Sequence, residues 1–113
     1  MTIEDLIRYG ANTREGLQRC MNNESFYLRL VKMIPGDANF SKLFDAVAVG
    51  DLNAAFEAAH ALKGSTGNLS LTPLYAPLGE VTELLRARTV MDYSAYMEVI
   101  RQNRDELERL CAL

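Results

Sequence analysis

The sequence predicts an all-α protein, an up-and-down antiparallel four-helix bundle with one or two short N-terminal helices. Apolar residues recur at intervals of three and four along most of the 113 residues, which is the spacing of one helix face. Gly, Pro, Asn and Asp residues fall singly between these segments, and the chain has no repeat, low-complexity tract or linker. Since connections of a few residues place consecutive helices antiparallel, we expect residues 1–113 to form a single helical domain.

Two short helices are expected at the N-terminus. Thr2 can cap a helix over residues 3–9, because a threonine hydroxyl accepts a hydrogen bond from a free backbone N–H of the first turn. Asn12, with Glu15 three residues later, has the pattern of a capping box and predicts a second helix that ends near residue 21.

A third segment, over about residues 23–34, has an apolar stripe and a clear end. Pro35 and Gly36 stop the helix, because proline removes a backbone donor and clashes with the preceding turn. The stripe that we expect to face the core consists of Phe26, Leu30 and Met33.

The first two helices of the bundle are expected over about residues 37–50 and 52–71. Asp37 and Asp51 are the expected N-caps, and Gly50 ends the first helix. The alanines of the second helix raise its helix propensity. The core-facing stripes are Phe40, Leu43, Phe44 and Val47 in the first helix, and Leu52, Phe56, Ala59, Leu62, Thr66 and Leu69 in the second.

The last two helices complete the predicted bundle. Thr72 is expected to cap a helix that has Pro73 at its first position and continues to about residue 88. Pro77 and Gly79 weaken its beginning and predict a kink or a late start. The final helix is expected over about residues 92–111, with one apolar face toward the core.

Composition excludes several classes of protein. The net charge is −3 and the 12 Lys and Arg residues are scattered, so we expect no nucleic-acid partner. No stretch approaches the roughly 20 apolar residues that span a bilayer, and acidic Glu4 and Asp5 are unlike the start of a signal peptide. Cys20 and Cys111 lack the spacing of a metal or redox site. We therefore expect a cytoplasmic monomer with no membrane partner.

The only histidine, His60, has an unusual set of neighbours. At about 100° per residue it lies roughly 120° from the centre of the core-facing stripe, so it should project near the solvent boundary. Lys63 follows at i+3, and Gly64 and Gly67 follow at i+4 and i+7. A glycine inside a helix costs about 1 kcal/mol relative to alanine, and we infer that these two provide clearance for a phosphoryl group or a partner protein.

The chemistry of imidazole fits this position. An imidazole is largely neutral at pH 7, so a histidine can attack phosphorus without a separate base. The attached phosphoryl group would carry about −1.5 to −2 charges, which the ammonium group of Lys63 can partly neutralise. In-line transfer then needs little beyond positioning. The pattern predicts a phosphotransfer module with His60 as the nucleophile.

Residues 59–69 read Ala-His-Ala-Leu-Lys-Gly-Ser-Thr-Gly-Asn-Leu. This run resembles the H-x-L-K-G-S-x-x-N-L signature of histidine-containing phosphotransfer (HPt) domains, sharply over about residues 51–71 and in outline over the whole chain. The resemblance implies a phosphorelay intermediate of two-component signal transduction, in which His60 accepts a phosphoryl group from the aspartate of one receiver domain and passes it to another. It implies response-regulator receivers as partners, with a hybrid histidine kinase as a further candidate.

The resemblance also implies that Lys63 and Gly64 take the roles argued above, that the divalent metal belongs to the receiver, and that this chain needs no cofactor. Two features depart from the family pattern. Many members place a Gln on the next helix near the histidine, but this chain has none between Gln18 and Gln102. Ser70 stands where a glycine is common. These departures bear on the detailed phosphate contacts more than on the acceptor.

Other interpretations stay open. A lone histidine on an alanine-rich helix is usually a surface or packed residue, and Gly67 alone could mark a close helix crossing. Glu80 and Glu83 could approach His60, although a charged surface face is the preferred interpretation. A bundle that binds a metal or haem would need several inward His and Glu residues. The alternative function is a non-phosphorylated module that docks on a receiver or kinase. We favour a phosphoryl carrier without enzymatic turnover.

Overall fold

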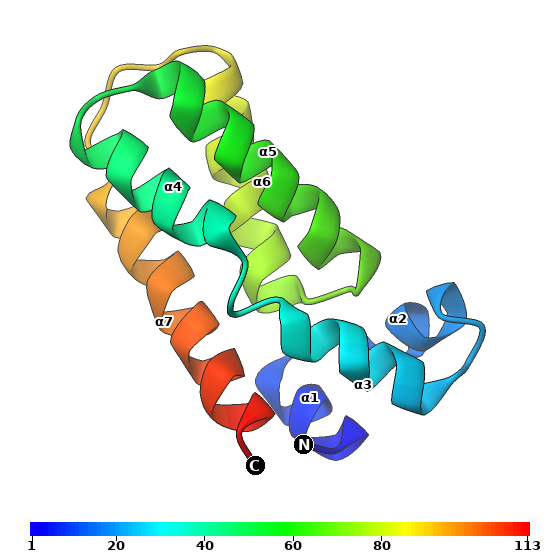
Figure 1. Ribbon diagram of the computed structural model, residues 1–113. Coiled ribbons are helices and arrows are strands. Elements are labelled where there is room, and N and C mark those ends of the chain that lie inside the picture. Colours follow the sequence, from blue (N-terminus) through cyan, green and yellow to red (C-terminus); the bar gives the residue numbers. More distant parts are fainter.

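The computed structural model describes all 113 residues as seven helices with no strand (Figure 1). This confirms the all-α prediction. Three helices precede the bundle, against the one or two of the predicted architecture, and the third lies in the segment expected over residues 23–34. The helices are α1 (Ile3–Tyr9), α2 (Thr13–Arg19), α3 (Glu24–Met33), α4 (Ala38–Ala48), α5 (Leu52–Asn68), α6 (Thr72–Arg86) and α7 (Ser94–Cys111).

Helices α4 to α7 form the long four-helix bundle, and α1 to α3 lie together at one end of it (Figure 1). Burial of apolar side chains from all four bundle helices holds it together. The outer edge between α4 and α7 is covered by two arginines, Arg101 and Arg104, whose guanidinium groups lie 4.5 Å and 5.7 Å from the ring centre of Phe44. Fully buried core residues include Leu43, Leu62, Leu78, Val81, Leu85 and Ile100.

The helix starts agree closely with the sequence prediction. The side chains of Thr2, Asn12, Asp37 and Asp51 each accept a hydrogen bond from a backbone N–H of the following turn. The helix after Pro73 is the exception, since Thr72 is already its first helical residue and no side chain caps it. The last helix begins at Ser94, and the carboxylate of Asp92 accepts a hydrogen bond from its N–H at 2.9 Å.

The ends of α2, α5 and α6 were predicted two or three residues too late. Met21, Asn22, Ser70 and Arg88 all have φ between 53° and 55°, which is the left-handed region. A residue in this region ends an α-helix, and glycine usually occupies it. Because none of the four is glycine, the sequence carries no stop signal, and α2, α5 and α6 end earlier than expected.

Two further expectations were wrong, namely a late start of α6 and an inward-facing stripe on α3. The helix α6 starts without delay and continues through Pro77, because fully buried Leu74 and Leu78 anchor it on both sides of the proline. In α3, two residues of the expected stripe do not face the core: Phe26 is 36% exposed and Met33 67% exposed, while Leu30 is half-buried at the edge of the core. The buried face of α3 is instead made of Tyr27, Val31 and Ile34.

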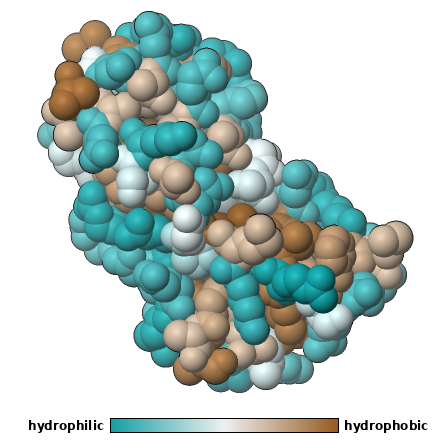
Figure 2. All heavy atoms as spheres, in the orientation of Figure 1, coloured by the Kyte–Doolittle hydropathy of each residue, from teal (hydrophilic) through white to brown (hydrophobic).

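The outward stripe of α3 leaves apolar atoms on the surface (Figure 2). A shift of one residue turns a helix by about 100°, so both stripes satisfy the same periodicity. The docking of Tyr27 decides between them. Its hydroxyl donates to the backbone carbonyl of Leu69 at 2.9 Å, which places this side of α3 against the end of α5.

Three residues of the N-terminal segment terminate α5. The last carbonyls of a helix have no partner within it, and a buried one needs another donor. Here the guanidinium of Arg19 donates to the Gly67 carbonyl at 3.1 Å, Tyr27 to that of Leu69, and the Asn12 N–H to that of Ser70 at 2.9 Å. We call this set of three hydrogen bonds the α5 cap.

Gly16 makes the α5 cap possible. A Cβ atom at this position would lie 2.6 Å from the Tyr27 ring and 2.8 Å from the Leu69 carbonyl oxygen. Any other residue would therefore push α2 away from the end of α5. The result is that the N-terminal segment is seated directly on the helix that carries the only histidine.

None of the seven helices combines the length and the hydrophobicity that a membrane span requires.

The α5 cap can be tested at Tyr27. Replacing it by phenylalanine leaves the buried Leu69 carbonyl without its donor, so Tyr27→Phe is expected to lower the unfolding free energy by about 1–2 kcal/mol at pH 7. Burial raises the pKa of Tyr27 from 10.0 to about 12. The stabilisation that the Tyr27 hydroxyl provides is therefore complete below pH 10. It is lost as the pH rises towards about 12, because in this range Tyr27 ionises in the unfolded chain but not in the folded one.

Urea unfolding of both proteins at pH 7, 10 and 11 measures this. The difference in unfolding free energy between wild type and variant is expected to narrow above pH 10, with a slope approaching 1.4 kcal/mol per pH unit. A difference that stays constant with pH would contradict the buried, protonated hydroxyl.

Candidate functional site

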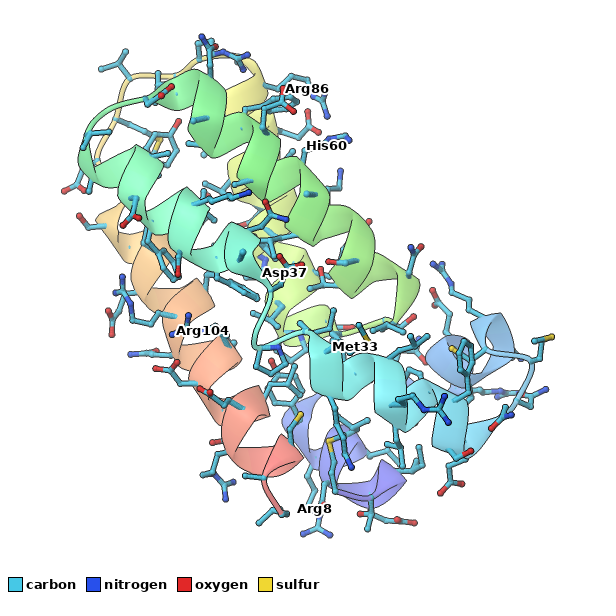
Figure 3. All side chains as sticks on the ribbon, in the orientation of Figure 1. Arg8, Met33, Asp37, His60, Arg86 and Arg104 are labelled. Atoms are coloured by element: carbon cyan, nitrogen blue, oxygen red, sulfur yellow. The ribbon has the colours of Figure 1, made fainter.

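His60 lies on the solvent side of α5, as its angular position predicts. Its neighbours Ala59 and Leu62 are fully buried, so they hold the helix against the core and leave the imidazole exposed. Figure 3 shows His60 projecting from α5 on the same side of the bundle as Arg86 of α6. The side chain is accessible to a reaction partner without any opening of the fold.

One face of the imidazole is backed by an aromatic ring. The centres of the Phe56 and His60 rings lie 5.6 Å apart with the planes tilted by 43°. The guanidinium groups of Arg86 and Arg88 lie 4.9 Å and 5.0 Å from the centre of the same Phe56 ring. These contacts restrict His60 on one side and gather positive charge next to it.

Lys63 is paired with a carboxylate of the neighbouring helix. Its Nζ lies 3.7 Å from Oε1 of Glu83, and Nε of Arg86 donates to the same carboxylate at 3.1 Å. The hydrogen bond from Arg86, with the charges of Arg86 and Lys63, lowers the pKa of Glu83, which keeps this residue ionised. Sequence patterns favour neither Glu83 nor Glu80. Only the packing of α6 on α5 shows which one meets Lys63.

The two glycines near His60 have different surroundings. A Cβ at Gly64 would meet nothing within 4 Å, so this position is open to solvent. A Cβ at Gly67 would lie 2.8 Å from Cε2 of Tyr75, because the tyrosine ring fills the space beside this glycine. The expectation that Gly67 leaves room for a partner is therefore corrected: its room is taken by Tyr75, as at a close helix crossing.

All four predicted site residues line one cavity of about 550 Å³. Helix α5 contributes His60, Lys63, Gly64 and Gly67 to it. The cavity continues beyond them to the α5 cap, where its lining includes Glu15, Arg19, Ser70 and Tyr75. Sequence reasoning missed the residues from α2, since no local pattern links residues 15–19 to a histidine more than forty positions later.

No group of three or more His, Cys, Asp or Glu side chains is placed to hold a metal ion. The cavity lining contains mainly polar and charged residues with a single hydrophobic one. A lining of this kind suits contact with the polar surface of another protein, or with an anionic group, better than it suits binding of an apolar cofactor.

The model of the Hpt domain family matches residues 36–112, more than half of the chain, including α4 to α7 and every predicted site residue. This chain belongs to the Hpt domain family. Comparison with curated proteins and comparison with solved structures each give no match. Membership places the chain in two-component phosphorelay, in which Hpt domains act as phosphoryl carriers and interact with receiver domains and histidine kinases. Helices α1 to α3 lie before the matched Hpt region.

The different surroundings of the two glycines predict different effects on stability. Gly64→Ala is expected to raise the unfolding free energy by roughly 0.5–1 kcal/mol, because the new methyl group meets no other atom and alanine favours the helix. The matched variant Gly67→Ala must displace the Tyr75 ring, so it is expected to be less stable than Gly64→Ala. Urea denaturation measures both, and a loss of stability in Gly64→Ala would contradict the open site.

Proposed function

We propose that this Hpt protein is a phosphorelay intermediate in which His60 accepts a phosphoryl group from a receiver aspartate and passes it to a second receiver. The observation that carries the proposal is the placement of His60. It is exposed on a rigid helix, beside a glycine with open space and at the edge of a polar cavity that also holds Lys63. A receiver can reach it without a change in the fold.

The transfer step needs only a free ring nitrogen. An unprotonated nitrogen of His60 attacks the phosphorus of the receiver's aspartyl phosphate, so that an N–P bond forms as the P–O bond to the aspartate breaks. The electron pair of the broken bond stays on the aspartate, which leaves as a carboxylate. The other ring nitrogen keeps its proton. The reverse reaction, on a second receiver, regenerates His60.

Lys63 and Glu83 give the site a way to accept negative charge. In the free protein the ammonium group of Lys63 faces the Glu83 carboxylate across 3.7 Å with both side chains partly exposed. Such a pair is weak, so its rearrangement costs little. When His60 carries a phosphoryl group, Lys63 turns to the phosphate while Arg86 keeps its hydrogen bond to Glu83.

The alternative function is a module that docks on a receiver or kinase without being phosphorylated. Intact-mass spectrometry separates the two. The protein and a His60→Gln control are incubated with phosphoramidate, then with a receiver domain phosphorylated by acetyl phosphate. We expect a single acid-labile phosphoryl adduct on the wild type and none on the control. A folded wild type that takes up no phosphoryl group from either donor would leave the docking module as the better account.

Glu83 is expected to set how strongly His60 holds its phosphoryl group. The Glu83 carboxylate competes for Lys63 and repels the phosphoryl charge, so Glu83→Gln should shift the equilibrium with a receiver towards phosphorylated His60, by about two- to tenfold. The matched control is Glu80→Gln, since Glu80 is exposed on the same helix without pairing with Lys63. The ratio of the two phosphorylated proteins at equilibrium measures the effect, and equal ratios for both variants would contradict it.

A further inference from the structure

The cavity beside His60 has a second end, which lies too far away to touch a phosphoryl group. Arg19 reaches the carbonyl of Gly67, seven residues along α5 from His60. At 1.5 Å per residue this is about 10 Å along the helix axis. Residues at this end can therefore contact a docked protein, but they cannot contact the phosphoryl group that is transferred. Arg19 lines this end, which we call the distal subsite.

The distal subsite has hydrogen-bond donors to spare. Arg19 has five N–H groups and is held by two hydrogen bonds, to the Gly67 carbonyl and to Oε1 of Glu15 at 2.8 Å. Both carboxylate oxygens of Glu15 are already engaged, one by Arg19 and the other by the side chain of Asn12 at 3.3 Å. The other N–H groups of Arg19 have no partner within the chain, and a carboxylate matches the planar fork of a guanidinium.

We propose that the distal subsite binds an acidic side chain of the receiver that docks on His60, and that Arg19 thereby helps to select the receiver. This inference rests on the proposed function. A specific interface covers about 800 Å² on each partner, so a receiver seated on His60 also covers the far end of a cavity that begins there. Arg19 comes from α2, outside the region that matches the family, so this contact is a feature of this chain's own N-terminal segment.

The α5 cap fixes the distal subsite before any partner arrives. Arg19 is tied to α5 through Gly67, and the contact of Gly16 with Tyr27 and Leu69 seats α2 on the same helix. A preorganised guanidinium loses little freedom when it binds a carboxylate. It also rejects receivers that present a cation at this point, because two like charges would be brought together.

The test is phosphotransfer to Arg19→Glu from a panel of receiver domains of the source genome, each phosphorylated with acetyl phosphate. For the receiver that serves the wild type best, the second-order rate is expected to fall about tenfold or more. Arg14→Glu is the matched control, since Arg14 is exposed on the same helix and does not line the cavity, and its rate should stay within about twofold. Loading of both variants by phosphoramidate should be unchanged, because the small donor touches only the His60 end.

A change on the receiver separates the docking contact from a structural effect of Arg19→Glu. Changing one acidic residue of the receiver to lysine should restore transfer to Arg19→Glu. If Arg19→Glu and Arg14→Glu accept phosphoryl groups from receivers at the wild-type rate, the distal subsite is overturned while the carrier function stands. If the wild type takes up no phosphoryl group at all, the proposed function itself fails.

Discussion

The structure depends on how the C-terminal end of α5 is terminated. A helix leaves its last carbonyls without partners, and in this protein those of Gly67, Leu69 and Ser70 receive donors from residues 12–27. The cap works only because Gly16 lets α2 approach the backbone of α5. Two turns before this end, the same helix presents His60 to solvent. A segment outside the region that matches the family thus fixes the helix that carries the proposed phosphoacceptor.

The surface around His60 is arranged so that a negative charge can be added without rebuilding it. Each nearby cation already has a partner: Lys63 faces Glu83, and Arg86 and Arg88 lie over the ring of Phe56. These partners are exposed or half-buried, so the contacts are weak and exchange at little cost. A rigid helix with adaptable side chains is what a carrier needs, because both its donor and its acceptor must fit the same face.

Much of this was predictable from local sequence signals. Four of the expected N-caps are present, since a capping side chain acts on a backbone N–H only two or three residues away. The exposure of His60 followed from helix angles alone. The ends of α2, α5 and α6 were not predictable, because left-handed Met21, Ser70 and Arg88 stand where glycine would have given the signal.

The features that failed are those that tertiary contacts decide. Phe26, Leu30 and Met33 fit the helical period as well as the buried stripe of α3 does, and only the hydrogen bond of Tyr27 to Leu69 selects the inner face. The same holds for the site. The Hpt-like motif on α5 located His60 and Lys63, but Glu83, Tyr75 and Arg19 enter the cavity from other helices. Contacts between segments that lie far apart in the sequence cannot be predicted from the residue spacing within either segment.

The measurement that tests the central claim most directly is ³¹P and ¹H–¹⁵N NMR of the full-length, ¹⁵N-labelled chain during incubation with phosphoramidate. We expect one new phosphohistidine resonance, with amide shifts centred on α5 near His60 and Lys63. The amides of Gly16 and Tyr27 should stay in place, because the α5 cap is not part of the reaction. A folded protein with no phosphohistidine resonance, or a phosphorylated one in which the α5 cap shifts as much as His60, would contradict the account.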